Sequence, residues 1–295
     1  MRHHTFVPIA FALTLSLVPA RAGDAAADLN AASESLHWTE AVDPVKIAGP
    51  IYFVGTEGLG VWLITTSKGH MLLNTGMPGS GPMIESSIRK LGFKTEDVKL
   101  LLVSHAHVDH VGALAYLKKA TGAKVVVMDV EANLLRSGGI TDFQYGKVRD
   151  FAFDRVIPDR TVRDGETVAL GKVKLTAHLT PGHTRGATTW TTTIHDGMKK
   201  YEVVFADGAG VPSSYRLGKN PSYPGIADDY KRTFDVLGSL KPDIWLTSHL
   251  EVLDFAAKRE RAVKDGAKAW VDPDGYAAWV AAAKDRFGAV LQAAE

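Results

Sequence analysis

The sequence of 295 residues contains no cysteine. Disulfide bonds and thiolate metal sites are therefore excluded, and any metal must be held by nitrogen and oxygen ligands. The sequence also lacks an excess of one charge, because 34 Lys and Arg residues nearly balance 33 Asp and Glu residues. The resulting net charge of +1 gives no broad electrostatic surface for nucleic acid, so we expect no nucleic-acid partner.

The sequence has no apolar run of the ~20 residues that a membrane-spanning helix needs. A shorter apolar run, 6–18, follows a start that includes Arg2 and precedes Ala20-Arg21-Ala22, which fits a signal-peptide cleavage site. We therefore expect residues 1–22 to be a cleavable signal peptide that exports the protein to the periplasm. Residues 23–295 would then form one domain without a stable membrane anchor.

Ligand-type side chains are concentrated in one short stretch, Ser104-His105-Ala106-His107-Val108-Asp109-His110. It follows an apolar, strand-like segment, 98–103, and α/β proteins tend to place their chemistry at such strand ends. Imidazole and carboxylate suit zinc. In an extended segment His105 and His107 point to the same side, so Asp109 and His110 could serve a second metal. A polar loop with accidental histidines is the weaker interpretation, because this pattern is more demanding than a lone histidine.

Two further histidines also follow strand-like segments. His183 comes after Pro181 and Gly182, which fix a tight loop, and His249 ends the short apolar segment 244–247. Strands that end on one edge would bring these loops to the first stretch, with His183 as a third ligand for one metal and His249 as a partner for Asp109 and His110. We interpret the remaining histidines of the domain as structural: His37, His70, His178 and His195.

Apolar periodicity predicts a mixed α/β domain with no solenoid repeat. The predicted order is strands, helices, more strands and more helices, which favours two mixed β-sheets packed together with helices on both outer faces. Residues 23–35 are Ala-rich and polar, and we expect them to be mobile. Strands are predicted at 51–55, 61–66, 70–74, 98–103, 124–128, 161–169, 173–179, 187–194, 201–206 and 244–247. Helices are predicted at 83–91, 111–120, 129–136, 226–240, 254–268 and 273–294.

Aromatic residues are placed where they could line a cleft. The segment 137–156 is punctuated by glycines and carries Phe143 and Tyr145, which indicates either a flap over a cleft or a loop folded onto the core. Trp38 is the first large apolar side chain after the signal, and it could pack against a sheet or line the same cleft.

These motifs together resemble the metallo-β-lactamase superfamily from Trp38 onward. The metal motifs of that family correspond to His105-x-His107-x-Asp109-His110, to Thr180-Pro181-Gly182-His183-Thr184 and to His249. Further matches resemble the third subclass of class B β-lactamases: Gly55-Thr56-Glu57-Gly58-Leu59, Thr176-Ala177-His178 and Asn220-Pro221-Ser222-Tyr223-Pro224-Gly225-Ile226.

The resemblance implies an αββα sandwich that holds two zinc ions per chain. It assigns His105, His107 and His183 to the first zinc, and Asp109, His110 and His249 to the second. A hydroxide bridging the metals would hydrolyse the amide bond of a small-molecule β-lactam and so confer antibiotic resistance. Asp109 and Tyr215 are then the candidate catalytic side chains, with Tyr215 donating to the developing oxyanion. We expect the enzyme to be a monomer.

Some positions depart from the family pattern. Many members of the subclass carry serines after the position of Asp207 that anchor the substrate carboxylate, whereas this chain has Gly208 and Gly210. Main-chain amides, or Ser213 and Ser214, would have to replace them. The candidate substrate-binding residues are thus Trp38, Phe143, Tyr145, Gly208, Gly210, Ser213 and Ser214. Asn74-Thr75 replaces a frequent Asp-Gly, and the C-terminal disulfide of many relatives is absent.

Two alternative functions remain open at this stage. One is a thioester or lactone hydrolase of the same superfamily, in which Asp207 would bridge the metals. The other is a zinc-binding protein without catalysis, whose metal site would be closed to exchangeable water.

Overall fold

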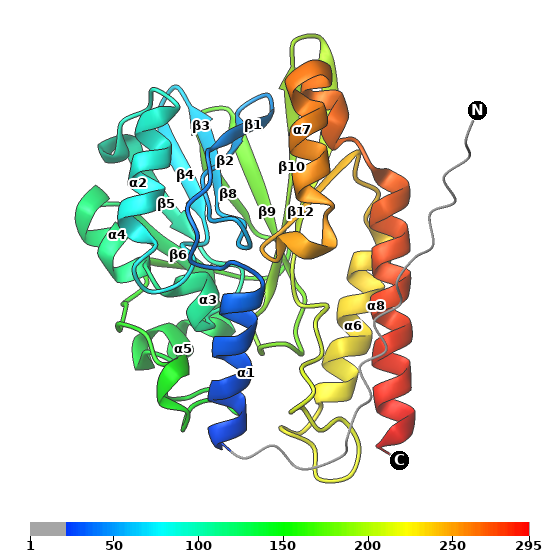
Figure 1. Ribbon diagram of the computed structural model, residues 1–295. Coiled ribbons are helices and arrows are strands. Elements are labelled where there is room, and N and C mark those ends of the chain that lie inside the picture. Colours follow the sequence, from blue (N-terminus) through cyan, green and yellow to red (C-terminus); the bar gives the residue numbers. More distant parts are fainter. Residues whose placement is uncertain (1–21, 295) are drawn as a thin grey trace.

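Alternating side chains on the strands decide the layers of this computed structural model, which describes residues 22–294. Leu102 and Val126 enter a core that contains residues of both sheets, whereas their neighbours Leu101 and Val125 enter a second core with the helices. Successive side chains of a strand point to opposite faces, so both faces of the first sheet are buried. Helices, sheet, sheet and helices therefore stack as four layers, which confirms the predicted αββα sandwich (Figure 1).

The first sheet has seven strands in chain order. Its first four strands pair antiparallel, and β4 to β7 pair in parallel. The carboxyl ends of β4, β5 and β6 therefore lie at one edge. The strands are β1 (Val45–Ala48), β2 (Ile51–Phe53), β3 (Trp62–Thr66), β4 (Gly69–Leu73), β5 (Val98–Leu102), β6 (Lys124–Met128) and β7 (Arg160–Val162).

The second sheet has five strands in the order β12-β11-β10-β9-β8. All of its pairs are antiparallel except β11 with β12, which run in parallel and so end at the same edge. Its strands are β8 (Thr167–Leu170), β9 (Val173–Leu179), β10 (Thr188–Asp196), β11 (Lys199–Ala206) and β12 (Ile244–Thr247).

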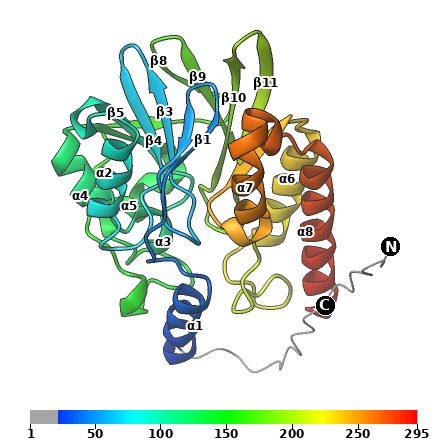
Figure 2. The ribbon, with the colours of Figure 1, turned by 45° about the horizontal axis from the view of Figure 1, so that its top comes forward.

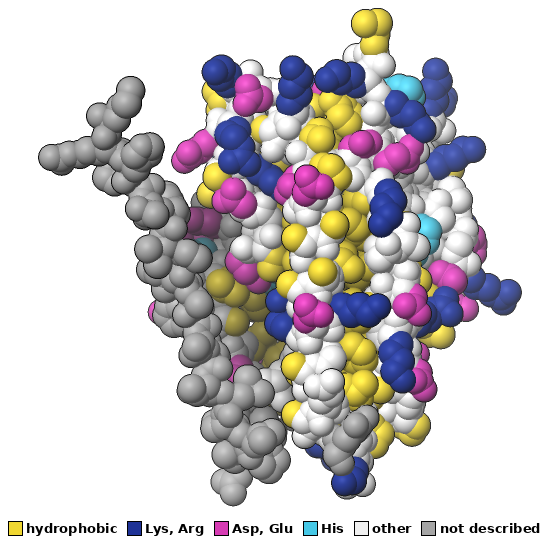
Figure 3. Space-filling model, turned by 90° about the vertical axis from the view of Figure 1, so that its right-hand side faces the viewer, with side chains coloured by type: hydrophobic (Ala, Val, Ile, Leu, Met, Phe, Trp, Pro, Cys, Tyr) yellow, Lys and Arg dark blue, Asp and Glu magenta, His cyan; other side chains and the backbone are white. Residues whose placement is uncertain are grey.

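Helices cover the outer faces of both sheets (Figure 2). One group, which includes α2 and α4, packs on the first sheet, and α6 and α8 lie on the far side of the second. On the side that carries α8, positive and negative side chains intermix with apolar ones (Figure 3). The helices are α1 (Ala22–Ser35), α2 (Gly81–Lys90), α3 (Val108–Val111), α4 (Leu114–Thr121), α5 (Ala132–Ser137), α6 (Ile226–Ser239), α7 (Phe255–Asp265) and α8 (Pro273–Ala293).

Three sequence-based expectations need correction. Residues 23–35 are not an irregular segment but belong to α1, because alanine favours helix and Leu29 is buried against Trp38, Leu59 and Val108. The predicted strand 161–169 is two strands in different sheets, separated by a turn at Gly165, whose φ is +76°.

The third correction concerns the helix predicted at 111–120. It is divided into α3 and α4, and α3 begins inside the histidine-rich stretch, so Asp109 and His110 lie on a helical turn. The short strand β1 was not predicted.

No helix among residues 22–294 is long and apolar enough to cross a bilayer. The predicted signal peptide, 1–22, lies outside the described residues except for Ala22.

Candidate metal centre

Loops that follow the ends of four strands bring all the candidate ligands together. The stretch 104–110 follows β5, His183 follows β9 and His249 follows β12, while Asp207 comes directly after β11. Gly182 is required beside His183, because its φ is +125° and a Cβ there would lie 2.7 Å from the Tyr230 ring. Parallel pairing of β11 with β12 thus brings together residues that are far apart in sequence.

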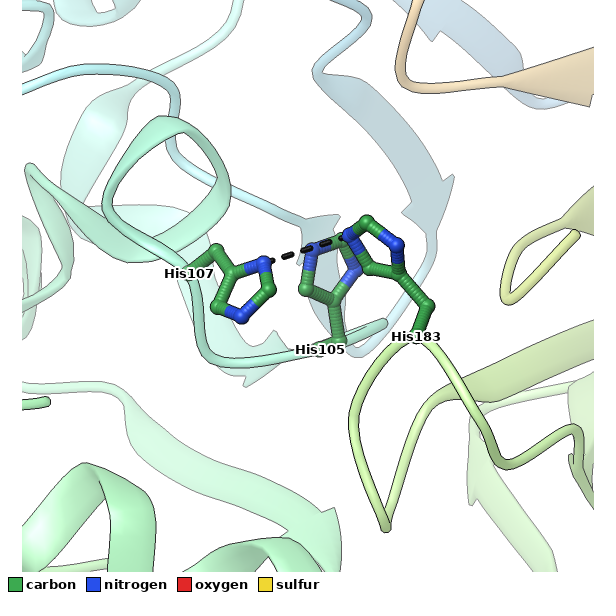
Figure 4. Close-up of side chains that lie close together, drawn as sticks. All are labelled: His105, His107 and His183. Atoms are coloured by element: carbon green, nitrogen blue, oxygen red, sulfur yellow. Dashed lines mark hydrogen bonds between the residues drawn. The ribbon is translucent and has the colours of Figure 1, made fainter. Parts of the chain in front are cut away.

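The first group of donors consists of His105, His107 and His183, whose ring nitrogens lie within 4.8 Å of one another (Figure 4). His107 Nδ1 lies 3.2 Å from His183 Nε2. His105 Nε2 is buried and has no hydrogen-bond partner among the described residues. His105 and His107 do point into the same group, as the alternation of an extended segment predicts.

The second group consists of Asp109, His110 and His249. Asp109 Oδ2 lies 3.1 Å from His110 Nε2 and 3.3 Å from His249 Nε2. The two groups are adjacent, because the ring centroids of His105 and His110 are only 3.7 Å apart. Two clusters of nitrogen and oxygen donors therefore lie side by side.

Burial and neighbouring charge give these groups very different pKa values. Burial lowers the pKa of His105 to about 4 and holds that of His183 well below its usual range. Burial alone would raise the pKa of Asp109, but His110 and His249 outweigh it and hold the pKa well below the ordinary value. Burial opposes protonation of His249 as well, yet Asp109 raises its pKa to about 9. His105 and His183 are therefore held as neutral imidazoles and Asp109 as a carboxylate, whereas the contact with Asp142 outweighs burial and raises the pKa of His107.

The donor spacings fit zinc. Tetrahedral zinc with bonds of about 2.0–2.1 Å places its ligand atoms about 3.3 Å apart. The separations of 3.1, 3.2 and 3.3 Å between donor atoms match that value in both groups. A buried imidazole nitrogen without a partner, as in His105, is costly unless something binds it. Imidazole and carboxylate are also ligands that zinc prefers.

Carboxylates support the far sides of two imidazole rings. His105 Nδ1 lies 3.0 Å from Asp207 Oδ2, and His107 Nε2 lies 3.3 Å from Asp142 Oδ2. Each contact leaves the other ring nitrogen facing the donor group, and such partners orient metal-binding histidines. Asp207 therefore lies on the Nδ1 side of His105, away from its free Nε2. This position is unfavourable for the metal-bridging role that the thioester-hydrolase alternative requires.

A buried carboxylate braces two ligand loops against each other. Glu131 Oε1 accepts a hydrogen bond from the main-chain N–H of Ala106 at 2.7 Å, and Oε2 accepts one from Gly186 at 2.9 Å. Burial raises the pKa of Glu131. The loops that carry His105 and His183 are thus held by one side chain.

The side chain of Asn74 links the stretch 104–110 to the loop that carries His249. Its Oδ1 accepts from the main-chain N–H of Ser104 at 2.9 Å, which fixes the orientation of the amide. Its Nδ2 then lies 2.6 Å from Ser248 Oγ and 3.3 Å from His110 Nδ1. Asn74 therefore links the segments before His105 and before His249.

The donors lie between two hollows. We name each hollow after the helix that it reaches: the α8 lobe has a volume of about 260 Å³ and the α1 lobe one of about 280 Å³. Trp38, His183 and His249 line both. The α8 lobe extends along Gly208, Ala209 and Gly210 to Trp279, Ala283 and Arg286 of α8. The α1 lobe extends along Tyr145, Phe151, Ser213 and Ser214 to Ala25, Asp28, Leu29 and Ala32 of α1. A larger hollow of about 370 Å³ beside His37 contains none of the six donors.

Most of the candidate substrate-binding residues line one of these lobes. Trp38 lines both and also packs against His249, with ring centroids 5.2 Å apart. Gly208 and Gly210 line the α8 lobe, while Tyr145, Ser213 and Ser214 line the α1 lobe. The segment 137–156 is therefore partly a cleft wall, although Tyr145 also stacks on Phe151 at 4.1 Å.

Two predicted site residues make contacts that the sequence does not indicate. The Tyr215 hydroxyl donates to the main-chain carbonyl of His183 at 2.6 Å and so supports this loop, and its donation to an oxyanion stays a prediction. Phe143 packs between Tyr215 and Tyr223 and lines neither lobe.

Glu131, Asp142 and Arg286 were not identified from the sequence. Glu131 reads as the start of a helix and Asp142 as part of a polar loop, and their partners are distant in the chain. The spacing of Trp279, Ala283 and Arg286 does indicate one helix face, but it does not reveal what that face lines.

A family model described as the metallo-beta-lactamase superfamily matches residues 61–249. The native FEZ-1 metallo-beta-lactamase from Legionella gormanii is 41% identical, with a TM-score of 0.84 over 86% of this chain and 97% of that chain. The class B3 di-zinc metallo-beta-lactamase LRA-12 from an Alaskan soil metagenome is 33% identical, with a TM-score of 0.81 over 86% of this chain and 96% of that chain.

Similarity to curated proteins is confined to part of the chain. A probable metallo-hydrolase of Burkholderia pseudomallei is 35% identical over 103 residues, which is 32% of this chain and 32% of that protein. The family match nevertheless covers more than half of the chain, and the two solved structures match over nearly their whole length. The chain therefore belongs to the metallo-beta-lactamase superfamily and, within it, groups with the class B3 metallo-beta-lactamases.

Proposed function

We propose that this protein is an exported zinc β-lactamase that opens the four-membered amide ring of small-molecule β-lactams. The observation that carries the proposal is the pair of donor groups, spaced as zinc ligands are, between two open lobes. The similarity to FEZ-1 and LRA-12, both named metallo-beta-lactamases, supports the same activity. The signal-like sequence of residues 1–22 supports action in the periplasm.

In the proposed enzyme, His105, His107 and His183 hold one zinc, and Asp109, His110 and His249 hold a second. Bound zinc would supply a water of near-neutral pKa and polarise the carbonyl of the substrate. Asp207 and Asp142 keep His105 and His107 oriented with their free nitrogens towards the cleft. Asp109 stays ionised beside His110 and His249, and Trp38 shields the donors from bulk water.

The test is hydrolysis by purified, zinc-loaded protein of a penicillin, a chromogenic cephalosporin and a carbapenem. We expect ring opening that stops on addition of a chelator and returns with zinc. Lys284→Ala, which changes an exposed residue of α8, is the matched control and should retain full activity. Absence of turnover of all three β-lactams by protein shown to contain zinc would refute the proposal.

A further inference from the structure

The α8 lobe contains a cation that neither the fold nor the metal centre requires. Arg286 lies on the exposed side of α8 and lines this lobe together with Ala283 and Trp279, which lie about one and two helical turns earlier. Trp279 is fixed by stacking on Trp245, with centroids 5.2 Å apart. The arginine therefore projects from a face of α8 that packing holds in place.

Arg286 has no competing partner. It makes no ion pair and no hydrogen bond with any residue of the described chain, 22–294. The two acidic residues that line the same lobe are placed against histidines: Asp207 contacts His105 at 3.0 Å, and Glu251 lies 3.9 Å from His249 Nδ1. The guanidinium group of Arg286 is therefore available to bind an incoming anion.

Main-chain donors line the same lobe. Gly208 turns with a φ of +88°, and its N–H donates to Asp207 Oδ1. The next two N–H groups, of Ala209 and Gly210, donate no hydrogen bond within the described residues. Free N–H groups that line the same lobe as a guanidinium group are suited to receive a carboxylate.

The α1 lobe has the opposite character. Its charged lining outside the donor groups is Asp28, and neither lysine nor arginine lines it. Its lining also includes the aromatic side chains of Trp38, Tyr145 and Phe151 and the small or apolar residues of α1. An anionic group would be repelled there, whereas an apolar or aromatic substituent would find contacts.

We propose that Arg286, with the free N–H groups of Ala209 and Gly210, forms the subsite that binds the ring carboxylate of the substrate. The acylamino substituent of the β-lactam then lies in the α1 lobe, and the amide bond lies between the two lobes, beside His183 and His249. This inference rests on the proposed β-lactamase function and specifies how its substrate is oriented.

The experiment compares a chromogenic cephalosporin as the free acid with its methyl ester, which lacks the negative charge. For the zinc-loaded Arg286→Ala variant we expect KM for the acid to rise about tenfold, the size of one lost charge-assisted hydrogen bond, with kcat unchanged. KM for the ester should be the same in the parent and the variant. Arg286→Lys should recover part of the loss, since it keeps the charge but loses the planar fork.

Lys284→Ala is the matched control, because it removes a cation from the same helix outside the lobe. It should leave both KM values unchanged. Raising the salt concentration should increase KM for the acid in the parent and much less in Arg286→Ala. Equal KM values for the acid in the parent and in Arg286→Ala, with equal salt dependence, would overturn the subsite.

Failure of the function and failure of the subsite remain distinguishable. If the parent opens neither the acid nor the ester, the β-lactamase proposal fails, and the subsite is tested with benzylpenicillin opened by alkali, a dicarboxylate. Calorimetric titration should then show binding to the zinc-loaded parent that is weakened about tenfold in Arg286→Ala. Equal binding to both proteins would overturn the subsite as well.

Discussion

The Asn74 side chain shows how much of the metal centre depends on one amide. It contacts Ser104 and His110 of the stretch 104–110 and Ser248 beside His249, and so joins two of the ligand segments. Its backbone also has a φ of +63°, which asparagine tolerates better than most other residues with a side chain. Position 74 therefore needs both the conformation and the hydrogen bonds.

We expect Asn74→Ala to lower zinc affinity by roughly 10- to 100-fold, because it removes the hydrogen bonds that orient the ligand segments. Competition with a chromophoric chelator measures the affinity directly. Asn74→Asp is the control and should bind zinc nearly as well as the parent, since the hydroxyls of Ser104 and Ser248 can rotate to donate to a carboxylate. Zinc binding by Asn74→Ala equal to that of the parent would show that the amide does not support the site.

His70 is a buried histidine away from the donors. Its ring packs edge-on against Phe93, and its Nδ1 has no hydrogen-bond partner among the described residues. Burial lowers the pKa of His70 below the ordinary value of 6.5. The unfolded chain therefore binds this proton more readily than the folded protein, so the free energy of unfolding falls as the pH drops below about 6.5.

We predict that His70→Gln, which removes the titrating group, makes the free energy of unfolding less sensitive to pH between 7 and 5. Urea unfolding of zinc-free protein at both pH values measures this sensitivity. His195→Gln changes an exposed histidine and should keep the pH dependence of the parent. The same fall in stability for His70→Gln as for the parent would contradict the assignment.

At the scale of elements, Glu131 joins the loop after β5 to the loop after β9 through two main-chain N–H groups. Glutamine at this position has a single acceptor oxygen, so its amide nitrogen would face another donor. We expect Glu131→Gln to cost about 1–3 kcal/mol of unfolding free energy, the cost of a buried donor without a partner. Denaturant unfolding measures this loss.

The exposed Glu260 provides the control for that experiment. Glu260→Gln should change the unfolding free energy by less than about 0.5 kcal/mol, as surface substitutions usually do. A similar small change in Glu131→Gln would mean that the two loops are held by other contacts.

Most elements could be located from the sequence because their apolar residues alternate or recur with the helical period. The change of sheet at Gly165 could not, since a strand pattern continues on both sides of the turn and only pairing separates β7 from β8. Helix α1 was missed because its burial depends on Trp38, Leu59 and Val108 of other segments.

For the site, the strand-end histidines and Asp109 were apparent because their spacing is unusual. Glu131 and Asp142 were missed because a carboxylate in a polar loop has no distinctive spacing, and its importance lies in partners that only the fold brings near. The contact of Tyr215 was missed for the same reason, because the surrounding sequence does not show that its hydroxyl donates a hydrogen bond to the main-chain carbonyl of His183.

At the scale of the whole molecule, the candidate ligands come from both sheets, so metal binding and folding should be coupled. A metal that binds only the folded protein raises the unfolding free energy, by about 2.7 kcal/mol at one hundred times Kd. We therefore expect a chelator to lower the Tm of zinc-loaded protein, measured by calorimetry, and added zinc to restore it. Asn74→Ala should show a smaller difference between the zinc-loaded and chelated states. Identical melting curves with and without chelator would argue against coupling.

A metal cradle made only of imidazole and carboxylate groups has a chemical consequence outside catalysis. Oxidants such as hydrogen peroxide attack sulfur first, and in this protein the sulfur belongs to six methionines and to none of the proposed ligands. Fully exposed Met198 lies at the tip of the β10–β11 hairpin, at the opposite end of β11 from Ala206. We therefore expect a dose of hydrogen peroxide that would inactivate a thiolate site to oxidise Met198 and to leave the proposed ligands intact.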